Sequence, residues 1–171
     1  NQSAIIAPMK YFTENNIWQL LRLSLSFIMI WAFFDKLFGL GFATASDKSW
    51  LSGVSPTAGF LKFAPDGVFA PFFNSLSGDI FVDLMFMGGL FLVGLCLLFG
   101  VGIKIASYSG ALMMFLIYLS LFPPENNPLI DEHIVYILVF IGLSIRVKKQ
   151  KFACGEKWTQ TSFVKKHPVF E

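Results

Sequence analysis

Charge is scarce in this chain of 171 residues: only 14% are Asp, Glu, Lys or Arg, against about 25% in an ordinary soluble domain. Apolar residues make up 55% of the chain and aromatic residues 17%, including 21 Phe. A domain of this size has too little interior to hide so many apolar side chains from water. The composition excludes a disordered chain and predicts an all-α integral membrane protein.

Cysteine, histidine and nucleotide-binding motifs are also sparse. Two cysteines, Cys96 and Cys154, are too few for a CxxC or multi-cysteine metal site. The chain has no Gly-rich phosphate loop, no HExxH sequence and no serine nucleophile elbow. The only histidines, His133 and His167, fall on opposite sides of the predicted membrane, which argues against a bis-His haem within the chain. We therefore expect no haem or metal in this chain.

Four apolar segments predict four membrane spans, because a helix needs roughly 20 mostly apolar residues to cross the hydrocarbon core. The predicted spans cover residues 17–40, 80–103, 105–122 and 132–147. The second and third are the cleanest and are separated by a tight turn at Lys104. Short connections favour antiparallel packing. The expected fold is an antiparallel four-helix membrane bundle over residues 1–147, followed by a basic cytoplasmic tail over 148–171.

The distribution of basic residues orients the predicted bundle. Residues 146–171 carry seven Lys or Arg against two Glu, and Lys10 and Lys104 lie near the same predicted face. This face is expected to be cytoplasmic, with both termini inside and the protein in the plasma membrane. A basic tail after an apolar segment favours contact with anionic lipid. No nucleic-acid-binding motif accompanies the charge, so no nucleic-acid partner is expected.

The long connection between the first two spans, residues 41–79, is rich in Phe and is broken by Pro56, Pro65 and Pro71. It is too long for a simple connector. We expect short amphipathic pieces that lie on the outer leaflet or cover the end of the bundle. A lid over a catalytic site is the less favoured alternative.

Ionisable residues inside a membrane are costly and therefore point to function. The topology gathers six of them near the outer boundary: Asp35, Lys36, Asp83, Asp131, Glu132 and His133. With Tyr118, Asn126 and Asn127 beside Phe-rich walls, such a cluster suits a quinone headgroup and proton exchange. The alternative is structural, since acids at a helix start cap it. Lys36 is expected to pair with Asp83 or Asp131, and Arg22 to bind lipid phosphate or to extend to the interface.

Several stretches resemble the DoxX/DoxD family of small four-helix membrane proteins, over about residues 18–145. These stretches are LRLSLSFIMIWAFFDKLFG, WLSGVSPTAGFL, LFLVGLCLLFGVGIKIASYSGALMMFLIYL and PPENNPLIDEHIVYILVFIGL. The segment from Glu125 to Tyr136 is the most specific of them. The positions that match the family motifs are Arg22, Lys36, Trp50, Asn127, Pro128, Asp131, Glu132, His133 and Tyr136. One position departs from the family, which often has Glu where this chain has Gly89.

The resemblance implies a membrane subunit of a quinone-linked oxidoreductase. The DoxD branch belongs to thiosulfate:quinone oxidoreductase, which oxidises thiosulfate to tetrathionate. In this hypothesis Asp131, Glu132 and His133 are catalytic, and the quinone contacts are Lys36, Trp50, Asn127, Tyr118, Tyr136 and Arg22. The electrons come from a partner subunit or pass directly from substrate to quinone. The main alternative is a non-catalytic accessory subunit of a larger membrane complex, and a small transporter is the third hypothesis.

Overall fold

The computed structural model describes residues 13–125, 127–147 and 154–170, and every regular element in these ranges is helical. Residues 148–153 of the predicted basic tail, which include three of its lysines, lie outside the described residues, as do Lys10 and Asn126. The four long helices are α1 (Glu14–Phe38), α4 (Ile80–Phe99), α5 (Ile103–Ser120) and α6 (Glu132–Ile145). Their bounds follow the four predicted apolar segments closely.

Local sequence signals set the helix ends. Thr13 caps the start of α1 by accepting from the Asn16 N–H, and Asp79 caps α4 by accepting from the N–H groups of Phe81 and Val82. Gly39 and Gly100 end α1 and α4 in the left-handed conformation, with φ of 67° and 68°. Because glycine has no Cβ, it adopts this conformation without steric cost.

Three of these helices, α1, α4 and α5, are long and apolar enough to cross a membrane. Helix α6 is apolar but has only 14 residues, about 21 Å at about 1.5 Å per residue. Asp131 caps its start and Arg146 follows its end, so the helix cannot extend in either direction as apolar structure. Of the four predicted spans, three are therefore confirmed as helices of spanning length, and the fourth stays a prediction. In its described part the chain has three helices of spanning length and one shorter apolar helix.

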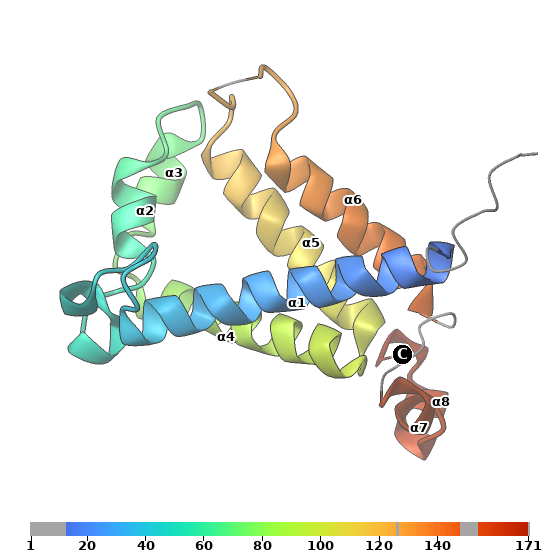
Figure 1. Ribbon diagram of the computed structural model, residues 1–171. Helices are drawn as coiled ribbons and strands as arrows, with labels where there is room; N and C mark the ends of the chain where they lie inside the picture. Colours follow the sequence, from blue (N-terminus) through green and yellow to red (C-terminus); the bar gives the residue numbers. More distant parts are fainter. Residues whose placement is uncertain (1–12, 126, 148–153, 171) are drawn as a thin grey trace, which may run out of the picture.

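The four helices form two antiparallel pairs that meet at one end (Figure 1). Helix α1 packs along α4, and α5 packs along α6. The two pairs converge where α1 and α5 begin and α4 and α6 end, and they diverge toward the other end. We call these the convergent end and the divergent end. This arrangement departs from the expected compact bundle, because α1 and α6 touch mainly at the convergent end.

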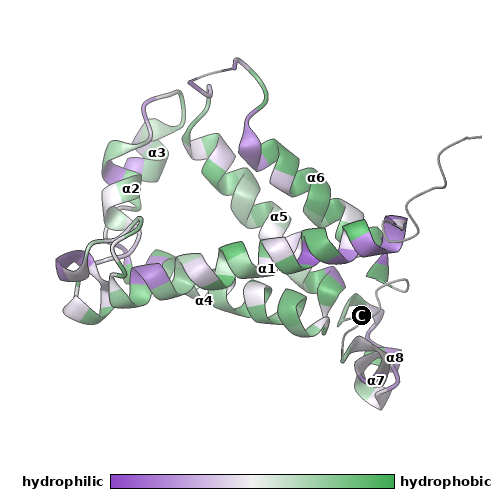
Figure 2. Cartoon of the chain, in the orientation of Figure 1, coloured by the Kyte–Doolittle hydropathy of each residue, from purple (hydrophilic) through white to green (hydrophobic). Residues whose placement is uncertain are grey.

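One apolar core joins all four helices. It is formed by Leu25 and Met29 of α1, Met87, Leu90, Val93 and Leu97 of α4, Ile103, Ala106 and Met114 of α5, and Phe140 and Leu143 of α6. Large apolar side chains also cover the outside of these helices, such as Phe27, Leu92 and Leu138, each more than 60% exposed. Figure 2 shows the apolar colouring continuing along α4, α5 and α6. An apolar exterior of this kind is expected of helices that face lipid.

Glycines permit the close helix contacts. A Cβ on Gly94 of α4 would lie 2.6 Å from Ile30 Cγ1 and 3.1 Å from the Ile30 backbone nitrogen. A Cβ on Gly110 of α5 would lie 2.5 Å from the ring of Phe140. A Cβ on Gly142 of α6 would lie 2.2 Å from the Trp18 ring. Small residues therefore let α1 approach α4, and let α6 approach both α5 and α1.

The connection between α1 and α4 folds into short helices, as predicted: η1 (Ser46–Lys48), η2 (Trp50–Ser52), α2 (Ala58–Phe63) and α3 (Ala70–Ser75). It bridges the divergent end of the molecule. Gly67, just before α3, lies directly against the backbone of Phe122, where α5 has ended. The connection thus runs from the α1/α4 pair to the α5/α6 pair (Figure 1).

The described part of the tail, residues 154–170, forms three further short helical segments. These are α7 (Gly155–Thr159), α8 (Ser162–Lys166) and η4 (Pro168–Phe170). They lie beside the convergent end, below the turn between α4 and α5 (Figure 1).

We predict that Gly94→Ala destabilises the α1/α4 pair, because the new methyl group must displace Ile30 and its backbone. The expected loss is about 1–3 kcal/mol, the usual cost of overpacking a core. Thermal unfolding in detergent micelles measures it. Gly88→Ala is the matched control, since a Cβ there meets nothing within 4 Å. Equal unfolding temperatures for the two variants would contradict this packing.

Candidate functional site

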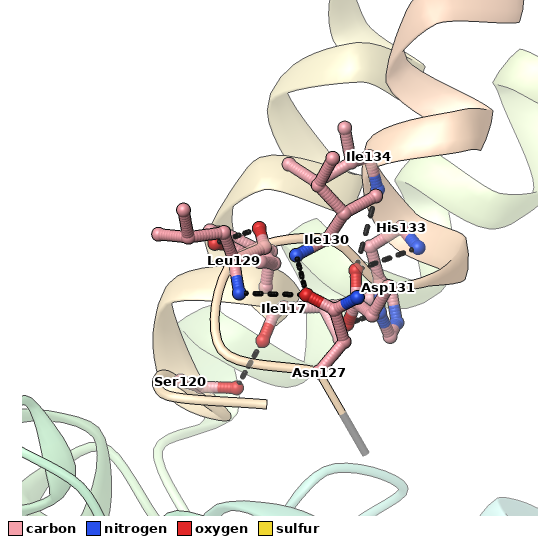
Figure 3. Close-up of polar contacts among 9 residues, drawn as sticks. Ile117, Ser120, Asn127, Leu129, Ile130, Asp131, His133 and Ile134 are labelled. Atoms are coloured by element: carbon pink, nitrogen blue, oxygen red, sulfur yellow. Dashed lines mark hydrogen bonds and ion pairs between the residues drawn. The ribbon is translucent and has the colours of Figure 1, made fainter. Parts of the chain in front are cut away.

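The strongest candidate site lies where α5 ends and α6 begins, at the divergent end. Asp131 is the N-cap of α6, and its Oδ1 accepts the N–H groups of His133 (3.0 Å) and Ile134 (3.3 Å). Its Oδ2 lies 2.8 Å from His133 Nδ1. Figure 3 shows the two side chains facing each other at the first turn of α6. One carboxylate therefore both caps the helix and orients the imidazole.

The chemistry of this Asp131–His133 pair follows from the hydrogen-bond roles. An ionised carboxylate only accepts, so Nδ1 of His133 donates its proton to Asp131. The other ring nitrogen, Nε2, then carries the lone pair of the neutral imidazole or the second proton of the charged one. Among the described residues nothing donates to or accepts from His133 Nε2. The pair has the carboxylate-oriented histidine arrangement of a general acid or base.

The loop before α6 supports this pair through its own backbone. Asn127 Oδ1 accepts the N–H groups of Leu129 and Ile130, both at 3.0 Å (Figure 3). The Tyr118 hydroxyl, buried on α5, donates to the Leu129 carbonyl at 2.7 Å. Asn127 and Tyr118 thus shape the loop that presents Asp131. Both were predicted as quinone contacts; in the structure the Asn127 amide oxygen and the Tyr118 hydroxyl form hydrogen bonds to the loop.

A cation is the other ligand that this cluster suggests. Asp131, Glu132 and His133 each offer one ligand atom, and the three atoms lie within 4.8 Å of one another. However, both Asp131 oxygens already accept hydrogen bonds from within the fold. Glu132 is exposed. The geometry favours proton exchange at His133 over metal binding.

The other predicted outer-boundary residues lie elsewhere, at the far end of the α1/α4 pair. Asp35 is 2% exposed and accepts the N–H groups of Phe42 and Ala43 at 3.2 and 3.0 Å. Its carboxylate thereby fixes the chain reversal after α1. Lys36 places its ammonium 5.9 Å from the centre of the Phe86 ring. It forms neither of the predicted ion pairs, with Asp83 or with Asp131.

Asp83 organises the long connection rather than a ligand site. Its Oδ1 accepts the hydroxyl of Ser55 at 2.8 Å, the hydroxyl of Thr57 at 2.5 Å and the Thr57 N–H at 3.3 Å. Asp83 itself is 3% exposed. A buried carboxylate is stable only with such donors. Because Asp83 belongs to α4, the contact ties the 41–79 connection to that helix.

The predicted cluster is therefore divided in two. Asp35, Lys36 and Asp83 lie with the α1/α4 pair, and Asp131, Glu132 and His133 lie with the α5/α6 pair, where the two pairs have diverged (Figure 1). Trp50 and Tyr136, also predicted as quinone contacts, are half-buried against the shared core. No sequence signal indicates this divergence, because the period and spacing of apolar residues do not specify the angle between helix pairs.

Arg22 lies near the convergent end and is 1% exposed. Its guanidinium donates to the carbonyls of Leu97 and Leu98, in the last turn of α4. One turn further along α1, the hydroxyl of Ser26 donates to the Gly94 carbonyl at 2.8 Å. Arg22 therefore binds the carbonyl end of a helix; its predicted contact with lipid phosphate or quinone stays a prediction. The carbonyl end of a helix is a favourable place for a cation.

Comparisons with models of protein families, with curated proteins and with solved structures found no match to this chain. The site must therefore be interpreted from its own geometry.

We predict that Asp83→Ala loosens the 41–79 connection, because it leaves three donors without their shared acceptor. The expected loss of stability is about 3 kcal/mol, in the range for deleting a charged hydrogen-bond partner. Limited proteolysis in micelles should show faster cleavage within the connection. Asp47→Ala is the control, since Asp47 is exposed in the same connection and accepts no described hydrogen bond. Unchanged cleavage of the Asp83 variant would contradict this role.

Proposed function

We propose that this protein is a membrane subunit of a quinone-linked oxidoreductase, similar to the DoxX/DoxD family, in which His133 exchanges protons with the quinone. The observation that carries the proposal is the Asp131–His133 pair, in which His133 Nε2 has no hydrogen-bond partner among the described residues. In the proposed arrangement α6 is the fourth membrane helix, because it packs along α5, which is itself of spanning length. The membrane is the plasma membrane, with both termini in the cytoplasm.

The proposed reaction is the two-electron reduction of a quinone coupled to the oxidation of thiosulfate. Reduction of a quinone to a quinol takes two electrons and two protons, and oxidation of two thiosulfate ions to tetrathionate releases two electrons. A partner subunit or the thiosulfate itself supplies the electrons. Protonated His133 gives one proton from Nε2 to one quinone oxygen, and Asp131 stabilises the imidazolium before that transfer. The second proton, for the other quinone oxygen, comes from water. Exposed Glu132 is placed to return protons from water to this end of α6.

The apolar surroundings support a hydrophobic substrate. Leu129 and Ile130, just before the pair, are 65% and 58% exposed. An isoprenoid tail that lies along α5 and α6 would contact surfaces of the same kind, such as Leu112, Phe115 and Leu138, all exposed. The quinone head would then meet the Asp131–His133 pair at the end of the apolar surface.

We predict that His133→Ala lowers thiosulfate-dependent quinone reduction by the purified complex at least about 100-fold, the lower range for losing a general acid or base. His167→Ala is the matched control, because His167 lies on the tail, beside the convergent end. The assay follows the loss of quinone absorbance with a short-chain quinone. Full activity of the His133 variant would disprove the proposed role.

The Asp131→Asn variant distinguishes the contribution of Asp131 to activity from its contribution to stability. Asn is as good an N-cap as Asp, so α6 keeps its start and its unfolding temperature. The amide cannot accept the Nδ1 proton through its nitrogen, so the imidazole loses its orientation and tautomer. We expect activity to fall with little change in stability. A variant that is unstable but, once folded, fully active would show that Asp131 is only a cap.

A non-catalytic accessory subunit is the second candidate function. The observation that favours it is the use of Asp35 and Asp83 within the fold, so that two of the four acids of the predicted outer cluster hold the connection in place. Gly89, where the family often has Glu, lies against Met113 and brings no acid. Native mass spectrometry of the protein extracted gently from its own membranes distinguishes the two. A bound quinone supports the oxidoreductase, and membrane partners with lipid alone support the accessory role.

A further inference from the structure

The C-terminal tail is a small folded unit held on the helix ends. The Cys154 N–H donates to the Phe99 carbonyl at 2.9 Å, which joins the tail to the last residue of α4. At the other end of the tail, the Phe170 carbonyl lies 3.9 Å from a Cβ built on Gly102, in the turn before α5. Two separate contacts thus fix the tail beneath the α4–α5 turn.

The tail also has an interior of its own. Val164 of α8 is 2% exposed, and the Trp158 indole N–H donates to the Phe170 carbonyl at 2.7 Å. The Phe163 ring packs against the rings of His167 and Phe170, with centroids 5.2 and 5.1 Å apart. These contacts bring α7, α8 and η4 together. The exposed side chains of the tail are therefore carried on a folded unit.

The location of the tail relative to the membrane follows from α4 and α5. Both helices are long and apolar enough to cross a bilayer, and the tail contacts the points where α4 ends and α5 begins. If these helices span, the tail lies at the boundary between hydrocarbon and water. Lys104, in the first turn of α5, lies at the same level.

The tail exposes positive charge and apolar groups close together in the sequence. Lys157, Lys165 and Lys166 are all exposed, and the two on α8 follow each other directly. Phe163 is 51% exposed and Val169 is 46% exposed. Lysine beside exposed aromatic and aliphatic side chains is the combination that binds an anionic lipid surface, through charge in the headgroup region and apolar contact below it.

We propose that the folded tail is a binding surface for anionic phospholipid, with Lys165 and Lys166 contacting the headgroup phosphates and Phe163 entering the acyl boundary. The inference is independent of the proposed oxidoreductase function, since the tail lies beside the convergent end, away from His133. The lipids that would bind are those of the leaflet in which the α4–α5 turn lies.

The test compares two double variants of the full-length protein. Lys165→Gln with Lys166→Gln removes two charges from the tail. Lys48→Gln with Lys62→Gln removes two equally exposed charges from the 41–79 connection. Native mass spectrometry of delipidated protein, titrated with phosphatidylglycerol or phosphatidylcholine, gives the apparent Kd for each lipid.

The unaltered protein should bind phosphatidylglycerol more tightly than phosphatidylcholine, and increasing salt should weaken that preference. The tail variant should lose roughly 30-fold in phosphatidylglycerol affinity, because each lysine near the surface contributes about 1 kcal/mol, and its phosphatidylcholine binding should be unchanged. The connection variant should keep the preference. Circular dichroism and unfolding temperature confirm that both variants are folded.

Three results would overturn the proposal. The first is no preference for phosphatidylglycerol in the unaltered protein. The second is an equal loss in both double variants, which would show only a general charge effect. The third is tighter binding of a single-stranded RNA oligonucleotide than of phosphatidylglycerol, abolished by the tail variant, which would assign the surface to nucleic acid.

Discussion

The contact between Arg22 and the carbonyl end of α4 is the constraint on which the convergent end depends. A guanidinium buried among apolar helices is stable only if its donors are occupied. Leu97 and Leu98 provide the acceptors because α4 ends at this point and its last carbonyls have no partner within the helix. The same contact fixes the register of α1 on α4, so that Ser26 reaches the Gly94 carbonyl and Ile30 occupies the space that a side chain at position 94 would fill. The core of all four helices is built around this register.

At the divergent end, carboxylates perform two different tasks. The carboxylate oxygens of Asp35 and Asp83 accept hydrogen bonds from backbone and hydroxyl groups of the connection. These two carboxylates therefore stabilise the fold. Asp131 differs because one of its oxygens caps a helix while the other orients a histidine. These acids differ in their partners: backbone and hydroxyl donors for Asp35 and Asp83, and an imidazole ring as well as backbone donors for Asp131. This contrast is why the candidate site is smaller than the cluster of acids along the chain.

The positions of the long helices were predictable from the sequence, since apolar runs and their flanking Gly, Asp and Thr residues are local signals. The chain near Asp131 was also predictable as a helix start, and the spacing to His133 placed both in one turn. The division of the outer cluster was not predictable, because it depends on the angle between the α1/α4 and α5/α6 pairs. That angle depends on contacts such as Gly142 against Trp18 and Gly67 against Phe122, which join residues far apart in the sequence. The fold of the tail was likewise not predictable, because its contacts with Phe99 and Gly102 join segments that are far apart in the sequence.

The shortness of α6 has a consequence for how the protein is made. A helix of 14 residues is a weak signal for release into the bilayer from the insertion machinery, and it is synthesised after the three longer helices. By then α5 already offers Gly110 as the place for the Phe140 ring, and α1 offers Trp18 against Gly142. In the proposed arrangement, in which α6 is a fourth membrane helix, α6 would enter the membrane against a preformed protein surface and not as an independent segment. Its insertion would depend on helices synthesised earlier, and a chain that lost α1 or α5 would leave α6 outside the bilayer.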